Sequence, residues 1–176
     1  MKPTVQKAYL SAGSNLGDRL ANLREGVSRL QGAGISVTRI SSCFETEPIA
    51  LPDQPWFLNL AMELETRFTP HQLLACCLWI EEQQGRVRSI PKRSRTLDLD
   101  ILLYEDLILE DPRLIIPHPD MAGRRFVLQP LAQIAPDQVH PTLKMTIRSL
   151  LDNCPDRSTV RCYSPGDLRL CIPILQ

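Results

Sequence analysis

The most constraining feature of this sequence is the stretch 95–103, which reads Arg-Thr-Leu-Asp-Leu-Asp-Ile-Leu-Leu. Apolar and acidic residues alternate along it, as they do along a β-strand whose two faces differ. We expect one face to carry Leu97, Leu99, Ile101 and Leu103, and the other to carry Asp98, Asp100 and Leu102. Each residue of a strand rises ~3.3 Å, so the α-carbons of Asp98 and Asp100 should lie roughly 6 to 7 Å apart on the same face.

Asp98 and Asp100, called the acid pair below, follow a basic stretch that holds Arg86, Arg88, Lys92, Arg93 and Arg95. Close carboxylates repel each other unless positive charge lies between them. Mg²⁺ suits this arrangement, because it takes a few carboxylate oxygens and leaves its other positions to water or phosphate. An isolated Asp-x-Asp is more often a solvated acidic strand. Here the neighbouring cations favour a metal-phosphate site, in which arginines and metal share the phosphate oxygens.

Length and charge exclude several classes of protein. A chain of 176 residues with 43% hydrophobic and 23% charged residues is typical of a globular domain. Lys plus Arg equals Asp plus Glu at 20 each, so no global field attracts nucleic acid or a membrane. The first residues lack an apolar signal-peptide core, and the six cysteines show no zinc or C-x-x-C spacing. We expect a cytoplasmic protein with reduced cysteines.

Periodicity and breakers predict the order strand, helix, strand, strand, helix, strand and then short helices. The expected strands are 8–12, 35–44, 57–66 and 95–103; the expected helices are 16–32, 69–85, 128–135 and 145–153. A further extended segment is expected at 112–119, and weak strand signals occur at 160–163 and 167–172. This order predicts an α+β fold, a ferredoxin-like sandwich whose antiparallel sheet has helices packed on one face. We expect a single domain over residues 1–176, with a C-terminal extension from about residue 156.

Other candidate residues have both structural and functional interpretations. His118 lies between Pro117 and Pro119, which restrict the backbone and aim the imidazole. Phosphate binding or acid-base chemistry and a purely structural role are both open for it. Glu81 ends a predicted helix just before the basic stretch, and Phe57 and Phe126 suit either core packing or stacking on a flat ligand.

Several of these segments together resemble the family of 6-hydroxymethyl-7,8-dihydropterin pyrophosphokinases, enzymes of folate biosynthesis. The matching segments are 12–17, 53–59, 81–88, 95–102 and 117–119, followed by Arg124-Arg125-Phe126 and Pro130-Leu131. The resemblance implies a ferredoxin-like fold and transfer of pyrophosphate from ATP to the pterin hydroxymethyl oxygen, with AMP as the other product. It also implies two Mg²⁺ ions, with ATP and the pterin as small-molecule partners. We expect a monomer that binds neither nucleic acid nor a membrane.

The resemblance also implies roles for individual residues. Asp98 and Asp100 would hold the magnesium ions, and Arg86 and Arg95 would act with them in catalysis. The implied ATP contacts are Glu81, Arg88, Ile101, His118 and Arg124. The implied pterin contacts are the rings of Phe57 and Phe126, the amide of Asn59, and Thr46 and Ile49.

Two other classes remain as alternatives. A ferredoxin-like sheet also serves RNA-binding modules, which need exposed aromatic residues on central strands and a basic face. The acidic strand and the zero net charge argue against that interpretation. A metal-dependent nucleotidyl or glycosyl transferase is the second alternative, and its products would differ because AMP would not be released.

Overall fold

Two long strands organise the sheet, because both bury their apolar residues almost along their full length. β1 (Gln6–Ser14) and β4 (Phe57–Thr66) pair antiparallel from Gln6 opposite Thr66 to Ser14 opposite Leu58. The computed structural model describes residues 4–47, 54–85 and 95–163. The other elements are α1 (Arg19–Gly32), β2 (Ser36–Ile40), β3 (Phe44–Thr46), α2 (Pro70–Gln83), β5 (Asp98–Tyr104), β6 (Leu109–Asp111), β7 (Leu114–Ile116), η1 (Met121–Gly123), α3 (Arg125–Ile134), α4 (Ile147–Asp152) and β8 (Val160–Cys162).

The main sheet has the order β5-β1-β4-β3-β8, and β2 also pairs with β4. β6 and β7 form a separate hairpin. The predicted strand at 35–44 is thus divided into β2 and β3, and both pair with β4. The weak strand signal at 160–163 is confirmed as β8, whereas the signal at 167–172 lies outside the described residues.

Local signals place the helix starts. Thr69 caps α2 in a capping box with Gln72, and Pro70 takes the first helical position, which agrees with the helix start expected at residue 69. Asp18 caps α1 by accepting a hydrogen bond from the Ala21 N–H. This helix therefore starts at Arg19, three residues after the expected start at Leu16. None of the helices in the described ranges is both long and apolar enough to cross a membrane.

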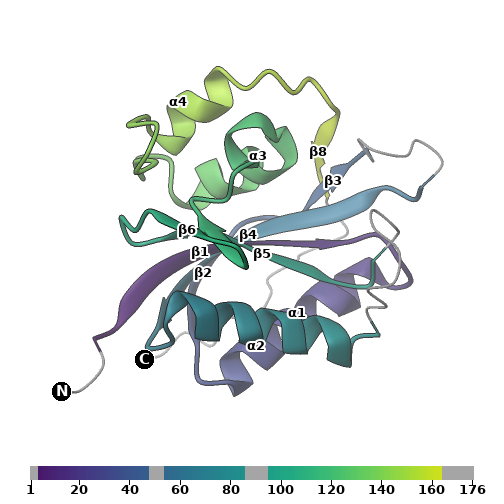
Figure 1. Cartoon of the computed structure of the whole chain (residues 1–176). Helices are drawn as coiled ribbons and strands as arrows, with labels where there is room; N and C mark the ends of the chain where they lie inside the picture. Colours follow the sequence, from purple (N-terminus) through teal and green to yellow (C-terminus); the bar gives the residue numbers. More distant parts are fainter. Residues whose placement is uncertain (1–3, 48–53, 86–94, 164–176) are drawn as a thin grey trace.

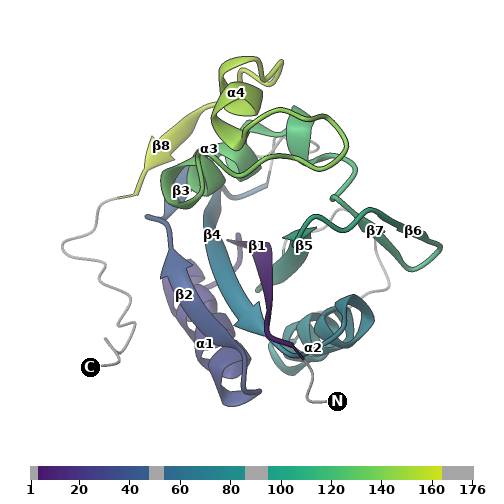
Figure 2. The ribbon, with the colours of Figure 1, turned by 90° about the vertical axis from the view of Figure 1, so that its left-hand side faces the viewer.

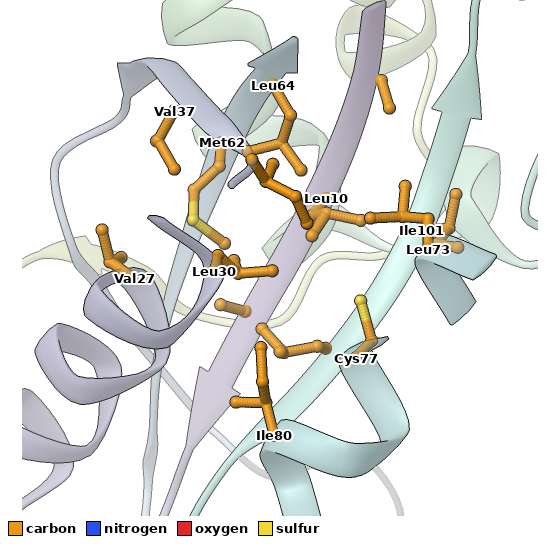
Figure 3. Close-up of a cluster of buried hydrophobic side chains, with 14 of the residues drawn as sticks. Leu10, Val27, Leu30, Val37, Met62, Leu64, Leu73, Cys77, Ile80 and Ile101 are labelled. Atoms are coloured by element: carbon orange, nitrogen blue, oxygen red, sulfur yellow. The ribbon is translucent and has the colours of Figure 1, made fainter. Parts of the chain in front are cut away.

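Helices cover both faces of the sheet (Figures 1 and 2). α1 and α2 pack on one face, over a core that includes Leu10, Leu30 and Met62 (Figure 3). On the opposite face, α3 and α4 cover a second core with Tyr9, Ala61 and Leu128. The α+β class and antiparallel sheet are confirmed, but packing on one face holds only for the two long helices. The short helices after β7 form the second layer.

The strict alternation predicted for the acidic strand holds from Leu97 to Ile101 and then breaks. Leu103 was expected beside Ile101, but it lies with Leu102 in the core on the opposite face. The cause is an irregularity in the pairing with β1, where Tyr9 pairs with Leu103 and the next residue, Leu10, pairs with Ile101. Leu102 is the extra residue, and such a bulge reverses the alternation beyond it.

Candidate functional site

The acid pair and Asn59 lie on one face of three neighbouring strands. Asp98 of β5 is opposite Gly13 of β1, which is opposite Asn59 of β4. Directly opposed residues share a face of the sheet. Since adjacent strands lie ~4.8 Å apart, the backbones of Asp98 and Asn59 are separated by about 10 Å. The predicted metal ligands and the predicted pterin partner therefore face the same space.

Gly13 keeps that space open. A β-carbon at this position would lie 2.6 Å from Oδ1 of Asn59 and 3.9 Å from Cδ1 of Phe57. A glycine inside a strand commonly marks a place where another group approaches the backbone closely. The sequence contained this signal, because Gly13 interrupts the apolar strand, but we expected the strand to end there and assigned Gly13 no role.

Asn15 connects three parts of the site. Its Oδ1 accepts a 2.6 Å hydrogen bond from the Arg95 N–H, and its own N–H donates to the Arg95 carbonyl at 3.0 Å. Its Nδ2 donates at 3.3 Å to the Pro55 carbonyl, just before β4. Asn15 is 2% exposed. It holds the segment that leads into β5 against the end of β1, a role that no local pattern in the sequence indicates.

Arg95 and the acid pair form a charged cluster. The Arg95 guanidinium makes an ion pair and a hydrogen bond with Asp98. Burial, followed by repulsion from Asp98, raises the pKa of Asp100 above its ordinary value. Three positive or ionisable side chains, His118, Arg95 and Arg124, partly offset this rise. The structure thus brings together residues that are up to 29 positions apart in the sequence.

The acid pair suits a hard divalent cation. Its charges repel each other in a partly buried setting, and Asp98 already attracts one cation, the Arg95 guanidinium. No group of three or more His, Cys, Asp or Glu side chains is placed to hold a metal within the described ranges. Two protein carboxylates are enough for Mg²⁺, which is commonly bound by one or two carboxylates plus water and substrate phosphates. A purely protein-made cage, as for structural zinc, finds no support here.

The predicted pterin residues gather beside this cluster. Nδ2 of Asn59 donates a buried 2.7 Å hydrogen bond to Oγ1 of Thr46, and Thr46 pairs with Phe57 between β3 and β4. Asn59 and Thr46 are 4% and 2% exposed. Phe126, at the start of α3, is only partly buried, and the Arg124 guanidinium lies 5.9 Å from the centre of its ring. Ile49 lies outside the described residues.

The predicted phosphate contacts come from the segment between β7 and α3. Nδ1 of His118 accepts a 3.2 Å hydrogen bond from the Asp120 N–H, and the His118 N–H donates to the Leu102 carbonyl of β5 at 2.9 Å. Nη2 of Arg124 donates to Asp120 at 2.6 Å. Asp120 therefore contacts both His118 and Arg124, through its backbone N–H and its carboxylate respectively. Arg86 and Arg88 lie outside the described residues.

Glu81 and Ile101, two predicted ATP contacts, both have buried side chains. Glu81 is 1% exposed, and its Oε1 accepts a 2.8 Å hydrogen bond from the Leu99 N–H, between the two acidic residues. This bond satisfies the outer edge of β5 and fixes the strand to α2. The Ile101 side chain is buried in the core under the helices, so only its backbone is available for a contact with ATP.

Comparisons with known proteins identify relatives of this chain. The sequence profile of 7,8-dihydro-6-hydroxymethylpterin-pyrophosphokinase (HPPK) matches residues 9–136. The Bacillus subtilis 2-amino-4-hydroxy-6-hydroxymethyldihydropteridine pyrophosphokinase is 47% identical over 128 residues, which cover 72% of this chain and 77% of that protein. The Schizosaccharomyces pombe folic acid synthesis protein fol1 is 44% identical over 161 residues, 91% of this chain. The match spans only 22% of the length of that yeast protein.

Among solved structures, Plasmodium falciparum HPPK-DHPS with pteroate has a TM-score of 0.69 at 17% sequence identity. The match covers 87% of this chain and 43% of that one, and at this identity it supports the fold alone. The family itself is shown by the profile match, which spans most of the chain, and by the high identity to the bacterial relative. This chain belongs to the 7,8-dihydro-6-hydroxymethylpterin-pyrophosphokinase family.

Proposed function

We propose that this chain transfers the pyrophosphoryl group of ATP to the hydroxymethyl oxygen of 6-hydroxymethyl-7,8-dihydropterin, producing AMP and the pterin diphosphate for folate biosynthesis. The observation that carries the proposal is the register across β5, β1 and β4. It puts the acid pair and Asn59 on one face, with Gly13 between them. A nucleotide phosphate on the acid side can then meet a flat heterocycle on the amide side.

In the proposed step, the hydroxymethyl oxygen of the pterin bonds to the β-phosphorus. The bond from this phosphorus to the oxygen that bridges the α- and β-phosphates breaks, AMP leaves with that oxygen, and the hydroxyl proton is released. Such a transfer depends on alignment and on neutralising charge, more than on covalent help from the protein. The residues of the site supply these two contributions.

Alignment of the pterin falls to Asn59, Thr46 and two rings. The Asn59 side chain is already oriented by Thr46, so its amide is suited to hydrogen-bond a flat amide-bearing ring without reorganising. Phe57 and Phe126 would stack on that ring, since neither is fully buried. Ile49, outside the described residues, remains a predicted contact.

Charge neutralisation falls to the arginines around the acid pair, with the His118 imidazole beside them. Arg95, His118 and Arg124 all act on the charge of Asp100, so a phosphate chain beside this carboxylate would be within their field. Arg124 would exchange its contact with Asp120 for phosphate oxygens. Arg86 and Arg88 are proposed to join from the basic stretch, and Glu81 supports the strand that carries the acid pair.

We further propose that Asp98 and Asp100 hold two Mg²⁺ ions. Bound there, the ions would neutralise phosphate charge and polarise the attacking hydroxyl. Arg95 would then release Asp98 and turn to the phosphates. A monomer working in the cytoplasm is the simplest setting for this reaction, and we propose both for the chain.

The test is incubation of the full chain with ATP, Mg²⁺ and the reduced hydroxymethylpterin, followed by identification of both products. Expected products are AMP and the pterin diphosphate in equal amounts, and ATP labelled in the β-phosphate should label the pterin. ADP would indicate ordinary phosphoryl transfer, and inorganic pyrophosphate would indicate nucleotidyl transfer; either would refute the proposal.

The RNA-binding alternative is disfavoured because helices pack on both faces of the sheet.

A further inference from the structure

We propose that the C-terminal segment, residues 156–163, positions the pterin residues by holding both sides of their site. The segment follows the part of the chain that the family profile matches, which ends at residue 136. The inference rests on the proposed function, because it assigns the segment to the same site. Two independent sets of contacts carry it, one to β3 and one to the start of α3.

The first set extends β3. β8 pairs antiparallel with it, with Thr46 opposite Val160 and Phe44 opposite Cys162. The ladder continues at both ends. The Tyr163 N–H donates to the Cys43 carbonyl at 2.8 Å, and the Thr159 N–H donates to Oε1 of Glu47 at 2.6 Å. A C-terminal strand is thus hydrogen-bonded along the whole length of β3.

This pairing matters for ligand binding because β3 spans only Phe44–Thr46. Without β8, it would be a three-residue edge strand whose outer N–H and C=O groups lack a strand partner. Such short elements open easily. Thr46 sits at the end of this strand and holds the Asn59 amide at 2.7 Å. Movement of β3 would therefore release the side chain that is proposed to recognise the pterin.

Two arginine–aromatic contacts join the same segment to α1 and to the residue before β4. The Arg161 guanidinium lies 5.2 Å from the centre of the Trp56 ring, directly before β4. Arg19 lies 5.7 Å from the centre of the Tyr163 ring, donates to the Trp56 carbonyl at 2.7 Å and pairs with Glu45 at 2.8 Å. The segment is thereby tied to the residues that flank the predicted ring at the start of β4.

The second set of contacts reaches α3. Oδ2 of Asp156 accepts a 2.8 Å hydrogen bond from the Arg125 N–H, the first residue of the helix. Arg124, at the capping position, makes no such side-chain bond. Asp156 therefore acts as a remote cap, and an anion is favourable at a helix start. Although burial pushes its pKa up, hydrogen bonds from Ser158 and Arg125 outweigh this effect and keep the pKa low.

The capped residue lies between Arg124, a proposed phosphate contact, and Phe126, a proposed pterin ring. One short segment thus holds Thr46 on one side of the site and Phe126 on the other. The covalent link between Asp156 and β8 is only three residues long, from 157 to 159, so the two sides cannot separate without breaking one set of contacts. This is a positioning role, since none of the segment's residues is assigned to touch the ligand.

The test compares four variants of the full chain: Asp156→Ala, Arg161→Ala, Arg161→Lys and, as control, Arg157→Ala. Arg157 is an exposed cation within the same segment. AMP formation is measured at varied pterin with saturating ATP and at varied ATP with saturating pterin, beside the Tm of each variant. A cation–π contact at an exposed site corresponds to about two- to fivefold in an equilibrium constant.

We expect Arg161→Ala to raise the KM for pterin about threefold, with the KM for ATP unchanged and with rescue by Arg161→Lys. Asp156→Ala should raise the KM for pterin about fivefold, and the control should match the parent. Lower Tm values with both KM values unchanged, or equal rises in the two KM values for Arg161→Ala, would refute the positioning role alone. A parent chain that forms no AMP from the pterin would instead refute the proposed function, and this role with it.

Discussion

Replacing Gly13 by alanine tests the geometry of the candidate site most directly. The new β-carbon would lie 2.6 Å from Oδ1 of Asn59, whereas real β-carbons essentially never approach closer than 3.0 Å. Asn59 must therefore move by at least about 0.4 Å. It is 4% exposed and bonded to Thr46, so it has little room to do so.

The magnitude follows from what this movement disturbs. Overpacking a well-packed site typically costs about 1–3 kcal/mol, and weakening the bond from Asn59 to Thr46 costs about 0.5–1.5 kcal/mol. If the displaced amide loses one hydrogen bond to the pterin, affinity for the pterin falls about tenfold, because 1.4 kcal/mol corresponds to a factor of ten. ATP does not share this contact in the proposed site, so its affinity should change less than twofold.

The assay measures the KM values for pterin and for ATP, and the Tm, for Gly13→Ala and for a matched glycine. Gly32→Ala is the control, because a β-carbon there meets nothing within 4 Å at the end of α1. This control should keep both KM values and hold or slightly raise stability. An unchanged KM for pterin in Gly13→Ala, with AMP formation intact, would show that Asn59 does not contact the pterin as proposed.

Four further predictions concern the charged and aromatic residues. Asp100→Asn should nearly abolish turnover. Folding raises the pKa of Asp100, so its charged form lowers stability at neutral pH and the penalty disappears as the carboxyl is protonated. The Tm of Asp100→Asn should therefore equal or exceed that of the parent at neutral pH. The two Tm values should converge as the pH falls toward the ordinary carboxyl pKa of 3.8. Phe57→Ala and Phe126→Ala should each weaken pterin binding by about 1 kcal/mol or more, beyond any effect on ATP; equal effects on both ligands would make these rings core residues. Arg95→Ala should lower kcat more than it raises the KM for ATP, and a pure KM effect would contradict a contact that strengthens in the transition state. Glu81→Ala should lower stability by about 1–3 kcal/mol in denaturant unfolding, because it leaves a buried N–H of β5 without its acceptor.

Much of the fold was predictable from local patterns. The alternation around Asp98 and Asp100, the Thr69-Pro70 helix start and the apolar run of β4 each reflect a period or a cap that is contained within a few neighbouring residues. Such signals need no distant partner to be meaningful. They were sufficient to expect an acidic strand inside an antiparallel sheet with helices.

Residue roles that depend on a partner strand were not predictable in the same way. Leu103 faces opposite to expectation because β5 gains a bulge only where it meets β1. The ATP contact of Glu81 stays a prediction, but the hydrogen bond that its carboxylate accepts from the backbone of β5 was not foreseen. Both outcomes depend on which backbone groups remain to be satisfied after the strands have paired, and a single segment does not contain that information.

The sequence by itself determined which faces the acid pair and Asn59 occupy on their own strands, because side chains alternate with a period of two. Only the tertiary structure decided that Gly13 lies between them, and that Asp156 and β8 reach back to both sides of the same site. The physical reason is register. Pairing between strands dozens of residues apart is selected by burial of the whole sheet and by satisfaction of its edges. A shift of one residue in β5 or β4 would have turned the acid pair or Asn59 to the opposite face.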